Sequence, residues 1–449
     1  MPKKEEQYDV IIVGTGFTGA TLAFSIAITG KKVIVFDKKK REEVGKDQII
    51  YLDKKTFNSS KLLQTYKNIE NVVRKTFFYS SDLNFSISLQ KREYVRFNLK
   101  EYINYMIESA IKAGVKFNFE TEITDPVGRG QWVIGVKTKE GKIVNGKIIV
   151  DCSGTERILT KNIEILDLNI KISSKEYVDT FYSINKIEKS EKILNQIRLE
   201  GDSFYCLFDR EFITKVEKEN DSISFFTIVN KNLTKRKAKA VTNEIINKSK
   251  GINLSPTNSF SEKVVVRRPI TLAWYGFLSI GEAAFQTNPF TVKGRNLSLI
   301  ALNIISEVIL EALQRREVSI YRLWKYHVEF SKIAGRHLAA LEAFRSLILS
   351  FNKEKLYFLF SKGLISKAEM HRIFLNKYPK QTFFDFLVKF FKGLTDIKTT
   401  YRFLNGLRKI NYIFYHYTKI PKEYAPKSYH DWYIKQLYLF KVFEEYCQN

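Results

Sequence analysis

Cysteine, proline and methionine are scarce in this sequence of 449 residues, which contains 3, 8 and 3 of them. The three cysteines, Cys152, Cys206 and Cys447, are too far apart in the chain to suggest a metal site or a disulfide framework. We therefore expect a protein of a reducing compartment without disulfide bonds. Five scattered histidines leave little room for a histidine-based metal site, so no metal is expected.

Long apolar runs are also missing. No stretch has about 18 uncharged apolar residues, the length that a membrane-spanning helix needs. The longest candidate, 297–313, is interrupted by Asn303, Glu307 and Glu311. The first residues, MPKKEEQ, are charged and lead directly into an apolar segment, which is unlike a signal peptide. These features predict a cytoplasmic protein.

Acidic residues are few relative to basic ones, 48 against 74, which gives a net charge of +26. Such a charge attracts polyanions, either nucleic acid or an anionic membrane surface. No nucleic-acid recognition motif accompanies the charge, so we expect no nucleic-acid partner. Peripheral contact with the inner face of a membrane and a solvated, lysine-rich surface both stay open.

The most informative segment runs from Asp9 to Asp37. Residues 10–13 are an apolar run typical of a buried parallel strand, residues 20–28 indicate a helix, and residues 32–36 indicate a second strand. The three glycines between the first strand and the helix follow the pattern GxGxxG. In that pattern the first glycine allows a tight turn, the second lets a pyrophosphate approach the backbone, and the third lets the helix pack closely.

The same segment predicts how a dinucleotide would bind. Its phosphates would lie on the N–H groups of the helix N-terminus, and Asp37, at the end of the second strand, would hold a ribose hydroxyl. An acid at this position favours FAD or NAD over NADP. A glycine-rich turn that binds nothing is the alternative. The predicted cofactor contacts in this segment are Gly14, Gly16, Phe17, Thr18, Gly19, Asp37 and Lys38.

The chain then alternates between helices and strands. We predict helices over 60–74 and 99–113, strands over 85–89 and 115–123, a hairpin over 132–144 and a buried strand over 148–150. The loop that follows, DCSGTER, contains Gly154 and suits a passage near a bound dinucleotide. Without other support, an ordinary turn at the end of a strand explains this loop better.

The last two parts of the chain differ in character. Residues 165–265 read as a separate sheet, with strands over 204–208 and 222–229 and a helix over 238–249. The aromatic strand 204–208 suits either the wall of an apolar pocket or plain core. From 331 the chain is mostly helical, and residues 376–432 mix aromatics with basic residues, which favours a packed helical cap over an interfacial membrane helix. His327, His337 and His416 are expected to be core or surface residues.

Residues 267–313 are the part of the sequence in which a resemblance to a known family is clearest. They read RRPITLAWYGFLSIGEAAFQTNPFTVKGRN and continue into an apolar helix. Together with the N-terminal glycines, the helix entry at Asn98 and the loop 152–154, this segment resembles the geranylgeranyl reductase family, especially its archaeal members. These are FAD-dependent enzymes of the aromatic hydroxylase-like flavoprotein group.

The resemblance implies an α/β fold, with a Rossmann-type FAD-binding domain, an inserted β-sheet substrate domain and a C-terminal helical region. The FAD-binding domain would comprise 1–60, 91–164 and 266–330, the substrate domain 61–90 and 165–265, and the helical region 331–449. By the same resemblance, the cofactor is FAD, and further residues would contact it: Asn98, Gly154, Gly281, Glu282, Pro289, Gly294, Arg295 and Asn296. Tyr205 and Phe208 would contact the substrate.

Three departures from the family pattern bear on the reaction. Residues 45–50 contain no cysteine where the family usually has one, Glu282 replaces an aspartate, and the loop 290–295 has a single glycine. The function that the resemblance implies is reduction of double bonds in a geranylgeranyl or other isoprenoid chain on a lipid or quinone, with an unidentified electron donor. A flavin-dependent monooxygenase of the same fold and a non-catalytic lipid-binding paralogue are the alternatives.

Overall fold

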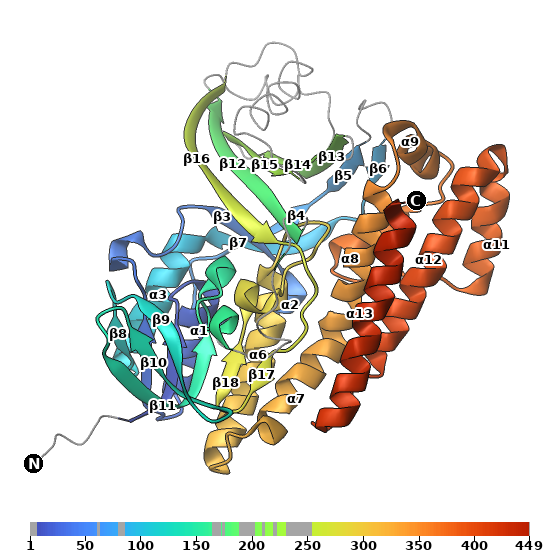
Figure 1. The fold of residues 1–449 in the computed structure, drawn as a ribbon. Coiled ribbons are helices and arrows are strands. Elements are labelled where there is room, and N and C mark those ends of the chain that lie inside the picture. The colour runs from blue at the N-terminus through green and yellow to red at the C-terminus, as the bar shows by residue number, and fades with distance from the viewer. Residues whose placement is uncertain are drawn as a thin grey trace, which may run out of the picture.

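The computed structural model describes residues 7–60, 63–79, 86–163, 172, 176–187, 203–208, 212–218, 222–229 and 254–448. Three sheets and a block of C-terminal helices make up this part of the chain (Figure 1). The α/β class that the sequence predicts is confirmed, with a parallel core near the N-terminus.

The first sheet has eight strands and a parallel centre. Strand β1 lies between β2 and β11 and pairs in parallel with both. Strands β9 and β10 continue β11 as an antiparallel meander, which confirms the predicted hairpin. The strands of this sheet are β1 (Tyr8–Val13), β2 (Val33–Phe36), β8 (Lys116–Asn118), β9 (Ile123–Arg129), β10 (Trp132–Thr138), β11 (Ile143–Asp151), β17 (Ala273–Trp274) and β18 (Phe277–Ser279).

Each face of β1 is covered by a different layer. Val10 and Ile12 belong to the apolar core that forms with helices α1 (Phe17–Ala27), α3 (Leu99–Lys112) and α6 (Arg295–Gln314). Ile11 and Val13 belong to the core that forms with the β9–β11 meander. A parallel strand that is covered on both faces needs an unbroken apolar run, which explains the sequence of this strand.

The second sheet has seven strands in the order β16-β12-β15-β14-β13-β5-β6. Strands β13 and β5 pair in parallel and join two distant parts of the chain. Strands expected over 85–89, 204–208 and 222–229 are present, whereas the helix expected over 238–249 lies outside the described residues. The domain boundaries stay a prediction. The strands are β5 (Thr76–Tyr79), β6 (Ser86–Ser88), β12 (Tyr177–Ile187), β13 (Ser203–Phe208), β14 (Phe212–Lys218), β15 (Ser222–Val229) and β16 (Leu254–Val265).

A third sheet corrects the prediction of a helix over 60–74. It contains β3 (Ile49–Asp53), β7 (Arg92–Asn98) and β4 (Glu70–Arg74), and the short helix α2 (Lys54–Asn58) follows β3. Strand β4 pairs antiparallel with β7, with Val72 opposite Tyr94. The helix prediction was wrong because the neighbouring valines, which favour strands, find a partner strand that lies outside the local sequence.

The strand predicted over 115–123 is shorter than expected. β8 ends at Asn118, and β9 begins at Ile123 in a different part of the same sheet. Between them Glu120 adopts a left-handed conformation, with φ of 53°. The chain turns here from the parallel centre of the sheet into the antiparallel meander. The apolar pattern that predicts one strand therefore covers the end of one strand and the start of another.

The C-terminal region is helical, as predicted. Gly406 of α12 lies directly against Leu347 of α8, so these two helices approach closely. His327 and His416 are buried and His337 is half-buried, which agrees with the expectation of core or surface positions. The helices are α7 (Ile320–Phe330), α8 (Arg336–Leu349), α9 (Lys353–Ser361), α10 (Lys367–Phe374), α11 (Phe383–Lys392), α12 (Ile397–Thr418) and α13 (Pro426–Gln448).

Helix α6 is the one helix in the described part of the chain that is both long and apolar enough to cross a membrane. Its most apolar stretch is 67% buried within the fold. It contacts α1 and α7, and the Ser25 hydroxyl of α1 donates a hydrogen bond to the Ser306 hydroxyl of α6 at 2.9 Å. These contacts make α6 a core helix of the parallel domain.

Candidate active site

The three N-terminal glycines form the tight turn that their spacing predicts. Gly14 has φ of 101°, and a Cβ atom there would lie 2.5 Å from the Cys152 carbonyl oxygen. A Cβ atom on Gly19 would lie 1.9 Å from the Gly14 carbonyl oxygen. At Gly16 no atom of the described part of the chain lies within 4 Å of the position a Cβ would take. Two glycines are therefore required by packing, and the third faces open space at the start of α1.

This open space is the end of a cavity of about 460 Å³. Gly16 is the N-cap of α1, and no side chain caps the helix. An uncapped N-terminus presents backbone N–H groups and the positive end of the helix dipole, which together bind an anion. Phe17 and Thr18, in the first turn of α1, also line the cavity.

Asp37 lies at the end of β2 and faces the same cavity. Its carboxylate accepts hydrogen bonds from the backbone N–H groups of Thr15 at 2.7 Å and Lys39 at 2.9 Å. The neighbouring Lys38 pairs with Glu156 at 2.6 Å, which joins β2 to the loop after β11. Asp37 therefore fixes the glycine turn to the second strand.

The loop after β11 is held by a buried carboxylate that the sequence did not single out. Asp151 accepts hydrogen bonds from the Ser153 backbone at 3.0 Å and from the Thr160 backbone at 2.8 Å. The loop places Gly154, which has φ of 66°, on the cavity wall. The signal was present in the sequence as an acid directly after an apolar strand, where a strand-end turn needs acceptors.

The opposite wall comes from the segment 281–298. Gly281 and Glu282 follow β18, and Gly294, Arg295 and Asn296 lead into α6; all five line the cavity. Glu282 is exposed to the space of the cavity, but the atoms crowded around it partly desolvate its carboxyl and raise the pKa. The negative charge of Glu262 raises this pKa further, whereas Arg295 and Lys46 oppose the shift. Burial lowers the pKa of the Arg295 guanidinium.

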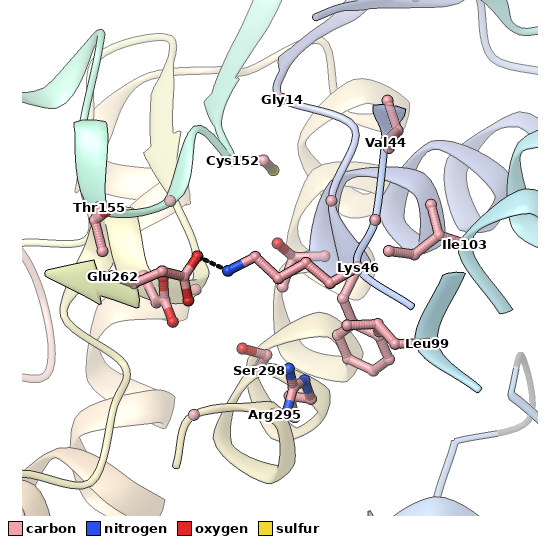
Figure 2. Close-up of a pocket in the computed structure, with 18 of the residues that line it drawn as sticks. Gly14, Val44, Lys46, Leu99, Ile103, Cys152, Thr155, Glu262, Arg295 and Ser298 are labelled. Atoms are coloured by element: carbon pink, nitrogen blue, oxygen red, sulfur yellow. Dashed lines mark ion pairs between the residues drawn. The ribbon is translucent and has the colours of Figure 1, made fainter. Parts of the chain in front are cut away.

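An ion pair crosses the middle of the cavity. Figure 2 shows Lys46 reaching towards Glu262 on β16, with Gly14 and Cys152 on one side and Arg295 and Ser298 on the other. The pair connects the segment after β2 with the seven-stranded sheet. In the sequence, Lys46 is only part of a stretch without cysteine, and no nearby residue indicates that it pairs with β16.

Beyond this ion pair the cavity reaches the seven-stranded sheet. Lys215 and Glu217 of β14 line it and pair with each other, and Tyr51 of β3 lies beside them, with the Lys215 ammonium 5.9 Å from its ring centre. The remaining sheet residues on the wall are Thr180, Tyr182, Phe226 and Val264. One cavity therefore joins the glycine turn to the second sheet.

Three predicted residues whose side chains are described do not line this cavity. Gly19 packs behind the turn. Asn98 caps α3, where its side-chain oxygen accepts hydrogen bonds from the N–H groups of Lys100 and Glu101. Pro289 is buried outside the wall. The side chains of Tyr205 and Phe208 lie outside the described residues, although β13 itself is present.

The loop between Pro289 and Gly294 has side chains where the family loop has glycines, and the structure shows where they lie. Val292 and Lys293 line the cavity, and Val292 adopts φ of 52°, an unusual conformation for a β-branched residue. The Asn288 side-chain oxygen holds the loop by accepting hydrogen bonds from the N–H groups of Phe290 at 2.8 Å and Thr291 at 3.1 Å. The strained loop is therefore built into the cavity wall.

Comparison with known proteins gives this site its context. The chain is 23% identical over 391 residues to the digeranylgeranylglycerophospholipid reductase of Sulfolobus acidocaldarius, which covers 82% of this chain and 83% of the relative. The chain is thus similar to a digeranylgeranylglycerophospholipid reductase over most of its length. The resemblance found in the sequence is thereby confirmed.

Solved structures and a family model extend the relationship. A geranylgeranyl bacteriochlorophyll reductase-like protein from Thermoplasma acidophilum matches with a TM-score of 0.68 at 16% identity, covering 90% of this chain and all of that one. A probable FAD-dependent monooxygenase from Pseudomonas aeruginosa matches with a TM-score of 0.56 at 13% identity, covering 79% of this chain and all of that one. Residues 36–169 match the tryptophan halogenase family model.

This geranylgeranyl reductase-like fold is that of an FAD-dependent oxidoreductase, and the residues present fit the cofactor. The open space at Gly16, the uncapped start of α1 and the carboxylate of Asp37 suit a pyrophosphate and a ribose. The prediction of FAD is confirmed at the level of the fold, while the contacts of individual residues stay predictions. Within the described residues, no group of three or more His, Cys, Asp or Glu side chains could hold a metal ion.

Proposed function

We propose that this protein is an FAD-dependent reductase that saturates double bonds in a geranylgeranyl or related isoprenoid chain carried by a lipid or quinone. The observation that supports it most is the single cavity that runs from the glycine turn at Gly16 to the seven-stranded sheet. Such a cavity holds a dinucleotide at one end and brings its reactive part towards a substrate that enters from the other.

In this proposal the chain's own residues have separate tasks. Gly16 and the first turn of α1 bind the pyrophosphate, Asp37 orients the adenosine ribose, and Glu282 with Arg295 hold the middle of the cofactor. Bound FAD, once reduced, would supply the hydride that one alkene carbon receives. The second alkene carbon needs a proton. Among the groups on the cavity wall, the Glu282 carboxyl with its raised pKa and the Lys46 ammonium can each hold one.

Because the cavity wall departs from the family pattern, we propose that residues particular to this protein determine where the substrate lies. Val292 and Lys293 stand where the loop would otherwise be glycine-rich, and both line the cavity. The Lys215–Glu217 pair makes the sheet end of the cavity polar. A lipid or quinone with a polar head and an isoprenoid tail matches such a mixed wall. We propose that the enzyme works at the cytoplasmic face of a membrane, where these substrates are found.

The direct test is a reaction of the purified protein with FAD, dithionite and a digeranylgeranylglycerol phospholipid. We expect products heavier by two mass units for each saturated double bond, seen by mass spectrometry, and flavin absorbance that is bleached by dithionite and restored by the lipid. Bleached flavin that the lipid does not reoxidise would contradict the proposed substrate. Protein that retains no FAD would favour the non-catalytic lipid-binding paralogue.

A flavin-dependent monooxygenase is the second candidate, and the similarity to the Pseudomonas aeruginosa protein favours it. The two reactions differ in their need for oxygen. Substrate-dependent oxygen consumption with NADH or NADPH supports hydroxylation, whereas reduction of the lipid under strictly anaerobic conditions supports the reductase.

A further inference from the structure

Helix α11 carries its apolar side chains outward. Its sequence, FFDFLVKFFK, has seven apolar residues out of ten, yet the single fully buried side chain is that of Lys389. Phe383 is 77% exposed, Phe384 72% and Phe391 67%. Exposed apolar residues that occur singly are ordinary, but a contiguous exposed group of phenylalanines indicates a surface that contacts something apolar.

The exposed group continues beyond α11 into the start of α12. We call it the aromatic face. Helix α11 lies at the outer edge of the molecule, on the far side of α12 from α13 (Figure 1). The eight residues of the aromatic face are Phe383, Phe384, Leu387, Phe390, Phe391, Leu394, Ile397 and Tyr401.

Helix α11 is held firmly in this orientation. The Lys389 ammonium donates hydrogen bonds to the Glu369 carboxylate at 2.8 Å and to the Leu364 carbonyl oxygen. Glu369 also accepts a hydrogen bond from the Gln381 side chain at 2.7 Å. Breaking a buried ion pair by removing one partner is strongly destabilising. Lys389 therefore fixes the buried side of α11, and the phenylalanines of this helix face outward.

The charge around the aromatic face is positive. Residues 377–402 contain six basic and two acidic side chains. Lys380, Lys392 and Lys398 are exposed beside the face. Both acids cap helices, since Asp385 accepts from the Thr382 N–H and hydroxyl and Asp396 accepts from the Thr399 N–H. Cations therefore dominate the border of the apolar surface.

We propose that the aromatic face docks on an anionic lipid bilayer. Phenylalanines of an amphipathic helix enter the boundary between headgroups and acyl chains, and lysines at the border attract anionic headgroups. A second copy of this chain is a poorer occupant, because residues 331–449 contain 21 basic and 9 acidic side chains and two copies would repel each other.

Docking at this face would also set the orientation of the cavity. Helix α10, which anchors Lys389, accepts a hydrogen bond at its Ile373 carbonyl oxygen from the Asn288 side chain at 3.1 Å. The same Asn288 amide donates to the Asn376 side chain at 2.9 Å and holds the loop that forms part of the cavity wall. This part of the inference rests on the proposed function, since it takes the cavity to receive a lipid.

The test is co-flotation of the full-length protein with vesicles of equal parts phosphatidylcholine and phosphatidylglycerol, without substrate or turnover. We expect Phe384→Ser combined with Phe391→Ser to lower the vesicle-bound fraction about tenfold, because two large apolar side chains no longer enter the bilayer. The matched control combines Ile28→Ser and Ile143→Ser, which are 53% and 51% exposed on the FAD-binding domain. The control should float as the unaltered protein does.

Equal flotation of the phenylalanine variant and the unaltered protein would overturn the proposal. So would equal binding to vesicles of phosphatidylcholine alone, since the anionic headgroups would then have no part. If the unaltered protein is a dimer in size-exclusion chromatography and the phenylalanine variant is a monomer, the aromatic face binds a second copy of the chain instead. Because no turnover is measured, failure of the reductase assay leaves the flotation result unaffected, and the two proposals fail separately.

Discussion

At the residue scale, one methyl group at Gly14 decides whether the cofactor end of the cavity can form. The left-handed φ of 101° and the Cys152 carbonyl oxygen 2.5 Å from the Cβ position both oppose a side chain. We expect Gly14→Ala to lose bound FAD, seen as lost flavin absorbance, and to destabilise the fold by roughly 2 kcal/mol or more.

Gly30→Ala is the matched control for that change. Gly30 also has a positive φ, 78°, but no atom of the residues described lies within 4 Å of its Cβ position. Only the backbone conformation is then penalised, by about 1 kcal/mol, and FAD should be retained. Loss of FAD in both variants to the same extent would mean that the close approach at Gly14 has no special role.

His327 makes a separate prediction about acid. Burial lowers the pKa of its imidazole to about 3, and neither ring nitrogen has a hydrogen-bond partner among the residues that the structure describes. The unfolded chain takes up a proton below its pKa of about 6.5, whereas the folded protein does not. Stability is therefore complete above pH 6.5 and falls as the pH drops towards 3, by at most about 5 kcal/mol from this residue.

The measurement is denaturant unfolding between pH 8 and pH 4, compared with His327→Phe. We expect the variant to lose less stability on acidification, since its ring cannot be protonated. His430→Phe, at an exposed position on α13, is the control and should follow the unaltered protein. Parallel pH profiles for His327→Phe and the unaltered protein would contradict the prediction.

At the element scale, Gly406 sets how closely α12 approaches α8. A Cβ atom there would lie 2.6 Å from the Leu347 Cδ1 atom, which is fully buried. We expect Gly406→Ala to destabilise the protein by about 1–3 kcal/mol, measured by thermal unfolding, because overpacking forces side chains from their rotamers. Because Leu347→Ala is itself destabilising, the test is a double-mutant cycle, in which Gly406→Ala should cost less stability in a Leu347→Ala protein than in the unaltered one. The same cost of Gly406→Ala in both proteins would argue against direct contact.

Elements also show where the sequence was informative. The β1–α1–β2 unit, the helix after Asn98 and the turn before α6 were all predicted, because their apolar periodicity and turn residues agree. The segment 60–74 was not, since Val72 and Val73 form a strand only when β7 lies beside them. Helix α11 was expected to pack into a cap. Its sequence gives no sign that Lys389, rather than a phenylalanine, is the buried residue.

At the scale of the whole molecule, three sheets and α6 meet around one cavity. A ligand that binds the folded state alone stabilises it by about 3 kcal/mol at a hundredfold excess over its dissociation constant. We expect FAD to raise the thermal midpoint of the unaltered protein and to leave that of Gly14→Ala unchanged. Riboflavin, which lacks the pyrophosphate, is the control ligand. If riboflavin raises the thermal midpoint as much as FAD does, the glycine turn does not contribute to the stabilisation.

The sequence by itself determined the parallel nucleotide-binding core, the glycine turn with Asp37 and the helical C-terminus, because each depends on residues that are close in the chain. Only the tertiary structure decided the rest. Lys46 meets Glu262, Tyr51 meets Lys215, and Lys389 meets Glu369 because separate elements fold onto one another. The amino-acid sequence specifies which side chains are apolar or charged. Which of them face a cavity, the core or the surrounding solvent is set by packing between distant segments.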